Sequence, residues 1–267
     1  MNRKVKLTPA YRKKTIALKN SNIHPAYLML LVFFSFQVAA QNSSDSKLSG
    51  TVTYSTDYIW HGYSKSDGNG VFQANLDYQH ETGFFGGVWV SQVDFGDGSI
   101  KVRGNRLFND VSRVEIIPYF GRTFSISEDW HGDVHWRRYI YDDNFFGKPG
   151  DYNEFSASLN FRDLLTANIG VTDNGYDRGG IYADYELLGQ YPLNDLIDFS
   201  AKVGYVQSRE ALNFDYLYWD VGLYFSYRFI GLDFRYFNSA RLNRKDEQRG
   251  GFAEVKPTFV FSVSLGF

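Results

Sequence analysis

The sequence has no cysteine among its 267 residues and only six prolines. Without cysteine the chain can form no disulfide framework, no thiolate nucleophile and no cysteine-ligated metal site. It also has no run of about 18 uninterrupted apolar residues, the length that a helix needs to cross a bilayer. A bundle of transmembrane helices is therefore excluded, and a hydrophobic fraction of 43% is too high for a disordered chain.

The first 40 residues lack acidic side chains but carry seven basic ones, followed by an apolar run over 26–38 and by Ala39 and Ala40. A basic segment, a short apolar core and small residues before a cleavage point are typical of a secretory signal peptide. The apolar run would reach only about 20 Å as a helix, which disfavours an uncleaved anchor. We therefore predict a signal peptide over 1–40, cleaved between Ala40 and Gln41, and export through the general secretory pathway.

The chain after Ala40 retains 21 basic and 30 acidic residues, a net charge of −9. An acidic exported protein is not expected to bind nucleic acid. Residues 41–47 are polar and without periodicity, and we predict a flexible periplasmic tether there. The rest of the chain alternates apolar and polar residues with a period of two, the pattern of half-buried strands. The sequence predicts twelve strands, at 51–60, 71–80, 84–94, 113–124, 131–141, 154–162, 165–172, 180–189, 197–207, 216–228, 231–239 and 257–267.

The gaps between these strands alternate in length. Odd-numbered gaps hold 7 to 18 residues and even-numbered gaps 2 to 7. Outer-membrane barrels have short periplasmic turns, long external loops and an even number of strands, and closure leaves no strand edge in lipid. We therefore predict an all-β fold over 48–267, a closed antiparallel up-and-down transmembrane β-barrel. Two weak points are Pro118, which lacks a ladder donor, and the pair Arg137 and Arg138, where we expect a bulge. The loops predicted to face outward are 61–70, 95–112, 142–153, 173–179, 208–215 and 240–256.

Two segments resemble known proteins. The ending 259–267 resembles the assembly signal of bacterial outer-membrane barrels, with one outward row of Phe259, Phe261, Val263, Leu265 and Phe267. The segment 55–66, Ser-Thr-Asp-Tyr-Ile-Trp-His-Gly-Tyr-Ser-Lys-Ser, with 73–78 and 83–95, resembles the start of the TorF family of porin-like proteins, also called the Gcw_chp family. That family usually has Arg in place of His61 and often Asn in place of Gln92. The resemblance implies a porin in the outer membrane of a Gram-negative bacterium, and it supplies no substrate.

Catalytic and metal-binding patterns are not found. His131 and His135 would lie about 13 Å apart on a strand, too far to share an ion. Asp133 shares a face with His135, but the sequence places no nucleophile beside them. The acidic cluster at 142–144 lacks the spaced oxygen ligands of a calcium loop and is interpreted as a solvated turn. We therefore predict no enzyme activity and no cofactor, and we interpret His135 as a polar residue facing the lumen.

The predicted function is a passive channel. A barrel of twelve strands lies between filled eight-stranded barrels and wide sixteen-stranded pores, so we expect a narrow pore for small hydrophilic solutes or ions. The inward rows carry nine acidic and six basic residues, which predicts a weak cation preference. Asp184 and Glu186 have no basic residue on the inward row of their own strand, so they are the candidates for the free charge. A non-conducting structural or surface-binding barrel and a lipid-modifying enzyme remain alternatives. The partners expected are periplasmic chaperones, the barrel assembly machinery and outer-membrane lipid, for a monomeric protein. The side chains predicted to line the pore are Asp77, Glu115, Glu154, Arg162, Asp184, Glu186, Lys202, Asp220, Arg228, Asp233 and Arg235.

Overall fold

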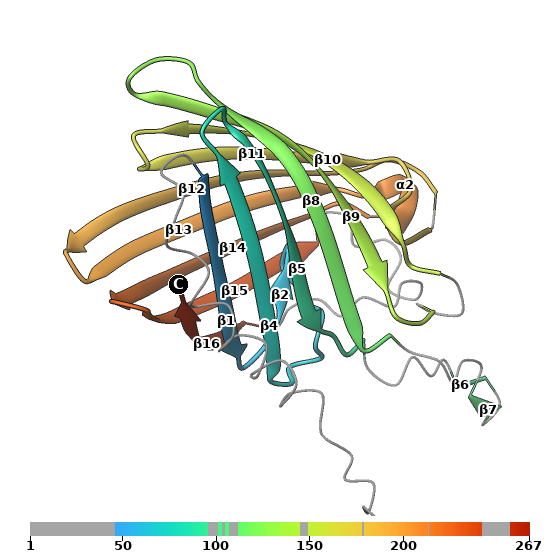
Figure 1. Cartoon of the computed structure of the whole chain (residues 1–267). Helices are drawn as coiled ribbons and strands as arrows, with labels where there is room; N and C mark the ends of the chain where they lie inside the picture. Colours follow the sequence, from blue (N-terminus) through green and yellow to red (C-terminus); the bar gives the residue numbers. More distant parts are fainter. Residues whose placement is uncertain are drawn as a thin grey trace, which may run out of the picture. The chain divides into compact units, whose positions relative to one another are not determined.

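Twelve antiparallel strands form a closed barrel in which each strand pairs with its neighbours in the chain and the last strand pairs with the first (Figure 1). The structure is a computed structural model that describes residues 46–95, 101–102, 105–106, 112–144, 149–177, 179–212, 214–241 and 257–267. The predicted all-β, twelve-stranded antiparallel barrel is confirmed. The barrel strands are β1 (Ser46–Ser55), β4 (Val71–His80), β5 (Phe84–Gln92), β8 (Val114–Ser125), β9 (Trp130–Tyr141), β10 (Tyr152–Phe161), β11 (Leu165–Thr172), β12 (Tyr182–Asn194), β13 (Ile197–Gln207), β14 (Tyr216–Tyr227), β15 (Ile230–Arg241) and β16 (Thr258–Gly266).

Smaller elements lie in the connections between these strands. Two short hairpins are formed by β2 (Ile59–Trp60) with β3 (Tyr63–Ser64) and by β6 (Lys101–Val102) with β7 (Asn105–Arg106). A 3-10 turn, η1 (Gly175–Asp177), and a four-residue helix, α2 (Arg209–Leu212), complete the described elements. No helix in the described ranges is long and apolar enough to cross a membrane.

The connections confirm the predicted alternation of lengths. At one end of the barrel the turns have two to four residues, at 81–83, 126–129, 162–164, 195–196 and 228–229. At the other end the connections are longer, at 56–70, 93–113, 142–151, 173–181, 208–215 and 242–257. We call these two ends the short-turn rim and the long-loop rim.

The largest error in the predicted strands is at the first one. β1 covers Ser46–Ser55 and pairs with β4 from Ser46 opposite His80 to Ser55 opposite Val71, whereas the prediction was 51–60. Ser46 and Lys47 therefore belong to the barrel and not to the predicted tether over 41–47. The predicted signal peptide and residues 41–45 lie outside the described residues. The alternation of apolar and polar residues continues in the sequence past Ser55 to Tyr58 and Trp60, so it does not mark the end of β1.

The predicted bulge at Arg137 and Arg138 is not found. The register between β8 and β9 is the same before and after Arg137 and Arg138. The pairing of the two strands is interrupted at Ile117 and Pro118 of β8, without a change of register. Proline has no N–H to donate, so the ladder loses a bond there without a change of register. The one register shift among the described strand pairs lies between β12 and β13, at Pro192.

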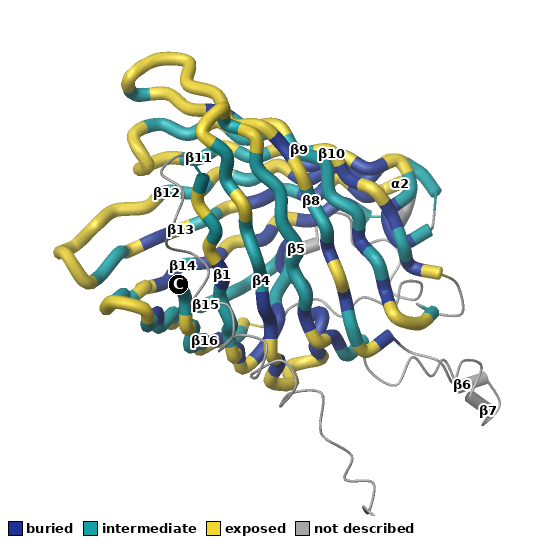
Figure 2. Tube along the Cα trace, in the orientation of Figure 1, coloured by how far each residue is buried: buried dark blue, intermediate teal, exposed yellow. Residues whose placement is uncertain are grey.

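The two faces of the sheet differ sharply in chemistry. Large apolar side chains stand exposed on the outward rows, for example Phe155 at 66% and Phe120 and Phe259 at 62%. The inward rows carry polar and charged side chains, and the buried stretches gather toward the long-loop rim (Figure 2). An apolar exterior around a polar interior is the arrangement of a barrel solvated by lipid.

The barrel closes at a seam where Phe267 meets Gly50. The Gly50 N–H donates to the Phe267 carbonyl at 3.3 Å, and the Phe267 N–H donates to the Gly50 carbonyl at 3.0 Å. A Cβ on Gly50 would lie 2.8 Å from the Phe267 ring, so glycine lets the ring cover the start of β1. The row Phe259, Phe261, Val263, Leu265 and Phe267 continues the outward face up to this seam, whereas its predicted role as an assembly signal stays a prediction.

Deleting Phe267 should lower the yield of folded barrel, because two backbone hydrogen bonds of about 1 kcal/mol each and the ring contact are lost at the closing seam. Phe267→Ala keeps the backbone bonds and should give a smaller loss. The folded fraction is measured by the gel-mobility difference between boiled and unboiled samples. Equal folded fractions for wild type and the deletion would contradict this role of the seam.

Candidate functional site

The first long connection, residues 56–70, folds into the barrel instead of facing outward as predicted. Figure 1 shows β2 lying inside the ring of strands. Tyr58, Tyr63, Lys65 and Ser66 are all buried, with exposures of 7% or less. Residues 95–112 and 240–256, two of the other loops predicted to face outward, lie largely outside the described residues. We call residues 56–70 the inner loop.

A tight hairpin shapes the inner loop. Trp60 pairs with Tyr63, and the two residues between them, His61 and Gly62, have φ of 44° and 77°. Positive φ at both central residues is the mark of the two-residue turn that best fits twisted strands. A Cβ on Gly62 would lie 2.3 Å from Cβ of Tyr218 on β14, so glycine is needed for the close approach as well.

A buried ion pair holds the inner loop at the long-loop rim. Lys65 Nζ lies 2.5 Å from Glu115 Oε2 on β8, and both side chains have no exposed surface. The hydroxyls of Tyr58 and Tyr141 also donate to the Glu115 carboxylate, at 2.8 and 2.5 Å. Because breaking a buried pair leaves an uncompensated charge, this contact strongly favours the inward position of the loop.

The hairpin tip contacts the opposite wall. His61 stacks on Tyr218, with 5.9 Å between the ring centroids, and its Nε2 lies 3.7 Å from Asp184 Oδ2 on β12. Burial lowers the pKa of His61 to about 3. His61 is therefore neutral at ordinary pH, so its contact with Asp184 is not an ion pair there.

Aromatic rings fill the layer of the lumen around the inner loop. Tyr139 is fully buried, and Tyr218 is 2% exposed. The hydroxyls of Tyr63 in the inner loop and Tyr176 in η1 are hydrogen-bonded to each other. The aromatic residues of this layer belong to two buried clusters, which include Tyr63, Tyr139, Tyr141, Tyr152 and Tyr176 in one and Tyr182, Tyr216 and Tyr218 in the other.

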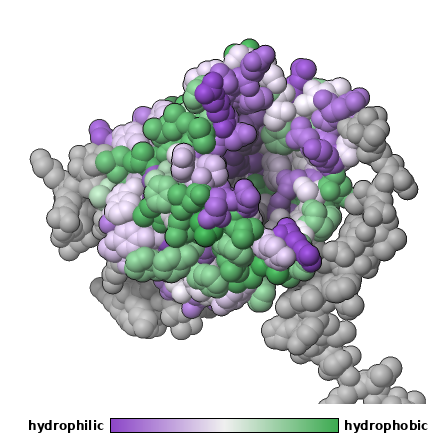
Figure 3. Space-filling model, turned by 90° about the vertical axis from the view of Figure 1, so that its left-hand side faces the viewer, coloured by the Kyte–Doolittle hydropathy of each residue, from purple (hydrophilic) through white to green (hydrophobic). Residues whose placement is uncertain are grey.

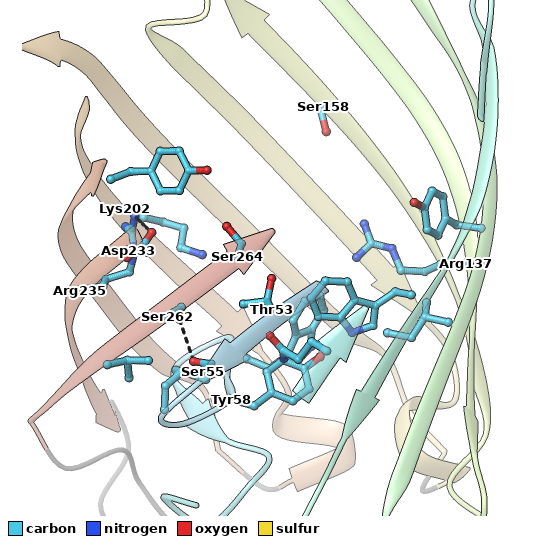
Figure 4. Close-up of a pocket in the computed structure, with 18 of the residues that line it drawn as sticks. Thr53, Ser55, Tyr58, Arg137, Ser158, Lys202, Asp233, Arg235, Ser262 and Ser264 are labelled. Atoms are coloured by element: carbon cyan, nitrogen blue, oxygen red, sulfur yellow. Dashed lines mark hydrogen bonds and ion pairs between the residues drawn. The ribbon is translucent and has the colours of Figure 1, made fainter. Parts of the chain in front are cut away.

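A cavity of about 870 Å³ extends from this aromatic layer toward the short-turn rim. Figure 3 views the end that carries the turns 195–196 and 228–229 and shows hydrophilic residues around a hollow, with hydrophobic residues on the flank. Lys202, Asp233 and Arg235 lie together on one wall of the cavity, and Arg137 lies on the opposite wall (Figure 4). Trp89 and Tyr119 line the same cavity.

The cations of the cavity wall are paired with carboxylates. Arg235 lies 2.5 Å from Asp220 and 3.1 Å from Asp233, measured from guanidinium nitrogen to carboxylate oxygen. Lys202 Nζ lies 3.2 Å from Glu186 Oε1. In the same way Arg137 lies 3.3 Å from Glu154.

Several other carboxylates of the interior, Asp184 beside His61 among them, have no permanently charged partner in the described ion pairs. Asp57 accepts hydrogen bonds from Ser64 and Ser66 at 2.6 and 2.7 Å. Asp77 accepts from Tyr119. Asp133 contacts only His135, at 2.7 Å.

Most of the residues predicted to line a pore lie on inward rows, but two do not. Arg162 and Arg228 have φ of 52° and 55° and lie in exposed turns at the short-turn rim, because β10 ends at Phe161 and β14 at Tyr227. Arg162 pairs with Asp129 of the adjacent turn at 2.7 Å. The predicted residues on inward rows are Asp77, Glu115, Glu154, Asp184, Glu186, Lys202, Asp220, Asp233 and Arg235.

The ring nitrogens of His135 are both in use. Nδ1 lies 2.7 Å from Asp133, and Nε2 contacts the Arg137 guanidinium. A general base needs a free nitrogen within reach of its nucleophile. This geometry does not favour a hydrolase at His135. Among the described residues, no group of three or more ligand side chains could hold a metal ion.

Sequence reasoning missed the inner loop, although its composition held a clue. Residues 58–65 concentrate three aromatic rings and a lysine around a His-Gly pair, an unusual content for an exposed loop. Histidine is among the residues that accept positive φ, so His61 and Gly62 could have been recognised as a turn. The partner of Lys65, Glu115, is 50 residues away, and no local pattern indicates that contact.

Solved barrel structures resemble this chain in fold. They include the KdgM porin, with a TM-score of 0.50 and 8% identity over 82% of this chain and 99% of that chain. The NanC porin has a TM-score of 0.50 and 10% identity, over 82% of this chain and 98% of that chain. The TodX monoaromatic hydrocarbon channel, as a deltaS2 mutant, has a TM-score of 0.50 and 10% identity, over 85% and 90%.

At these identities the likeness establishes the fold. No curated protein matches the chain. A family model described as "Bacterial protein of unknown function (Gcw_chp)" matches residues 39–267. The match spans the whole of the chain beyond the predicted cleavage point and includes all twelve barrel strands. The chain therefore belongs to the Gcw_chp family of bacterial proteins.

Proposed function

We propose that this protein is a narrow outer-membrane channel for small hydrophilic solutes, with a weak preference for cations. The observation that carries the proposal is a closed sheet with an apolar exterior and a charged interior that holds a cavity of about 870 Å³. An apolar band around a polar lumen lets strands cross lipid and gives a hydrated path inside. The proposed route to the outer membrane is export by the segment 1–40, followed by periplasmic chaperones and the barrel assembly machinery.

The interior charge supports the cation preference. Among the described residues, the inward rows and the buried part of the inner loop carry ten carboxylates and five cationic side chains. Acidic rings in a wall of low dielectric constant concentrate cations. Of the two carboxylates that the sequence left as candidates for free charge, Glu186 pairs with Lys202, whereas Asp184 has only the contact with His61. Asp57, Asp77 and Asp133 join Asp184 as carboxylates that can act on passing ions.

The filled layer at the long-loop rim favours a second candidate, a non-conducting barrel. The inner loop and the tyrosine clusters occupy the lumen there, with Lys65, Glu115 and Tyr139 fully buried. Single-channel recording separates the two candidates, with the wild type compared with a variant in which 59–66 is replaced by a Gly-Ser linker. Current steps in the wild type support a channel, and a silent wild type supports the non-conducting barrel. Steps in the variant alone would identify the inner loop as the part that closes the lumen.

Neutralising two interior carboxylates should weaken the cation preference. Asp77→Asn with Asp133→Asn should move the reversal potential in a KCl gradient toward zero, because two carboxylates without a permanently charged partner leave the interior of the barrel. The shift should be largest at low salt, since the Debye length is about 30 Å at 0.01 M and about 3 Å at 1 M. The matched control is Glu128→Gln with Asp163→Asn, two exposed carboxylates of the short turns. An anion-selective wild type, or equal shifts in both double variants, would refute the assignment.

The long-loop rim should face the outside of the cell. An epitope tag inserted after Asp143, in the connection 142–151, should bind antibody on intact cells, because long connections of outer-membrane barrels are external. A tag after Thr82, in the turn 81–83, should bind only after the outer membrane is permeabilised. Labelling of the Thr82 tag on intact cells would reverse the proposed orientation.

A further inference from the structure

The Lys65 ammonium occupies a site with the chemistry of a cation receptor. Nζ lies 5.0 to 5.9 Å from the centroids of five aromatic rings and 2.5 Å from a carboxylate oxygen of Glu115. Aromatic faces within about 6 Å attract ammonium groups, and sets of such rings form cages for them. The rings of this cage are those of Tyr58, Trp60, Tyr139, Tyr141 and Tyr176.

Four of the six groups that surround the Lys65 ammonium lie outside the inner loop, three of them on barrel strands. Tyr139 and Tyr141 are on β9, Glu115 is on β8 and Tyr176 is in η1. If the Lys65 side chain withdrew, these groups would stay in place. Glu115 would then be a buried carboxylate without a cation, and such a group strongly favours the entry of another positive charge.

The cage adjoins the cavity. Tyr58 and Trp60 form part of the cage, and both also line the cavity of about 870 Å³. Asp57 lines the same cavity beside them. A cation drawn into the acidic interior therefore reaches the outer face of two cage rings.

We propose that the part of the cage outside the inner loop, Glu115 with the rings of Tyr139, Tyr141 and Tyr176, is a binding site for primary alkylammonium solutes, that Lys65 is its resident occupant, and that a solute amine displaces Lys65 and releases the inner loop. The proposal rests on the proposed channel function and names the class of solute that acts on that channel. Lys65 Nζ donates to Glu115 and lies 3.4 Å from the Tyr141 hydroxyl, so the site selects ammonium groups that carry N–H donors. The four methylenes of the lysine side chain make n-butylammonium the closest mimic.

The first test measures binding to a vacated cage. Lys65→Ala should unfold at a lower temperature than wild type. Addition of n-butylammonium at ten times its dissociation constant should raise that temperature by about 3–5 °C. Tetramethylammonium, 1-butanol and sodium at equal ionic strength should give little or no shift, because each lacks either the N–H donors, the charge or the apolar stem.

The matched control for this test removes the counter-charge. Lys65→Ala combined with Glu115→Gln keeps the vacated space but should lose the response to n-butylammonium. An equal response in the two variants, or no response in Lys65→Ala, would overturn the binding site.

The second test uses the wild-type protein, and it decides the matter if Lys65→Ala does not fold. Chymotrypsin cleaves after aromatic residues, and Trp60 and Tyr63 of the inner loop are protected by the loop's inward position. n-Butylammonium should increase cleavage at these two positions several-fold, whereas tetramethylammonium should not. Unchanged cleavage at saturating amine would overturn the displacement of Lys65.

Neither test depends on ion conduction. The proposed channel and the proposed alkylammonium site can therefore be refuted separately. A barrel that stays silent in bilayers but responds to n-butylammonium would refute the channel and retain the ammonium site. A conducting barrel that shows no amine response would refute the ammonium site and retain the channel.

Discussion

A buried ammonium needs a counter-charge, and Lys65 finds it in Glu115, with no exposed surface on either side chain. Leaving one member unpaired would cost about 3–5 kcal/mol. The inner loop must therefore enter the lumen if the buried Glu115 side chain is to have a cationic partner on its inward row. The backbone supports the same position, because the Lys65 N–H donates to Tyr58 and the Asp94 N–H donates to Lys65, both at 2.7 Å.

The barrel wall is shaped to receive the loop on the side opposite Glu115. A Cβ on Gly204 would lie 2.1 Å from the ring of Tyr218, so a glycine on β13 lets that ring lie flat against the wall. The flat ring leaves space for His61, which stacks on it. Two glycines, Gly62 on the loop and Gly204 on the wall, thus set the approach of the hairpin, and the ion pair holds its other end.

The sequence predicted the barrel well because the information for strands is local. Alternation along each strand and the parity of gap lengths identified twelve strands, and they placed residues such as Glu154 and Asp220 on the correct face. Arg162 and Arg228 were misplaced because each stands one residue beyond a strand end, where a positive φ replaces the alternation. The inner loop could not be predicted, since its position depends on contacts such as Lys65 with Glu115 that join residues far apart in the chain. Glu186 was taken as free for the same reason, because its partner Lys202 lies on the neighbouring strand.

The lumen is thereby divided into two layers with different origins. The layer toward the short-turn rim is built from paired side chains on the strands, such as Arg235 between Asp220 and Asp233, and its charge is fixed by the strand register. The layer toward the long-loop rim is built around a segment that is not part of the sheet, so its contents can change without opening any strand pair. A closed sheet keeps every backbone group satisfied in lipid whatever the loop does. The selection of ions by the charged layer and the closure of the lumen by the inner loop can therefore change independently of each other, because different parts of the chain build the two layers.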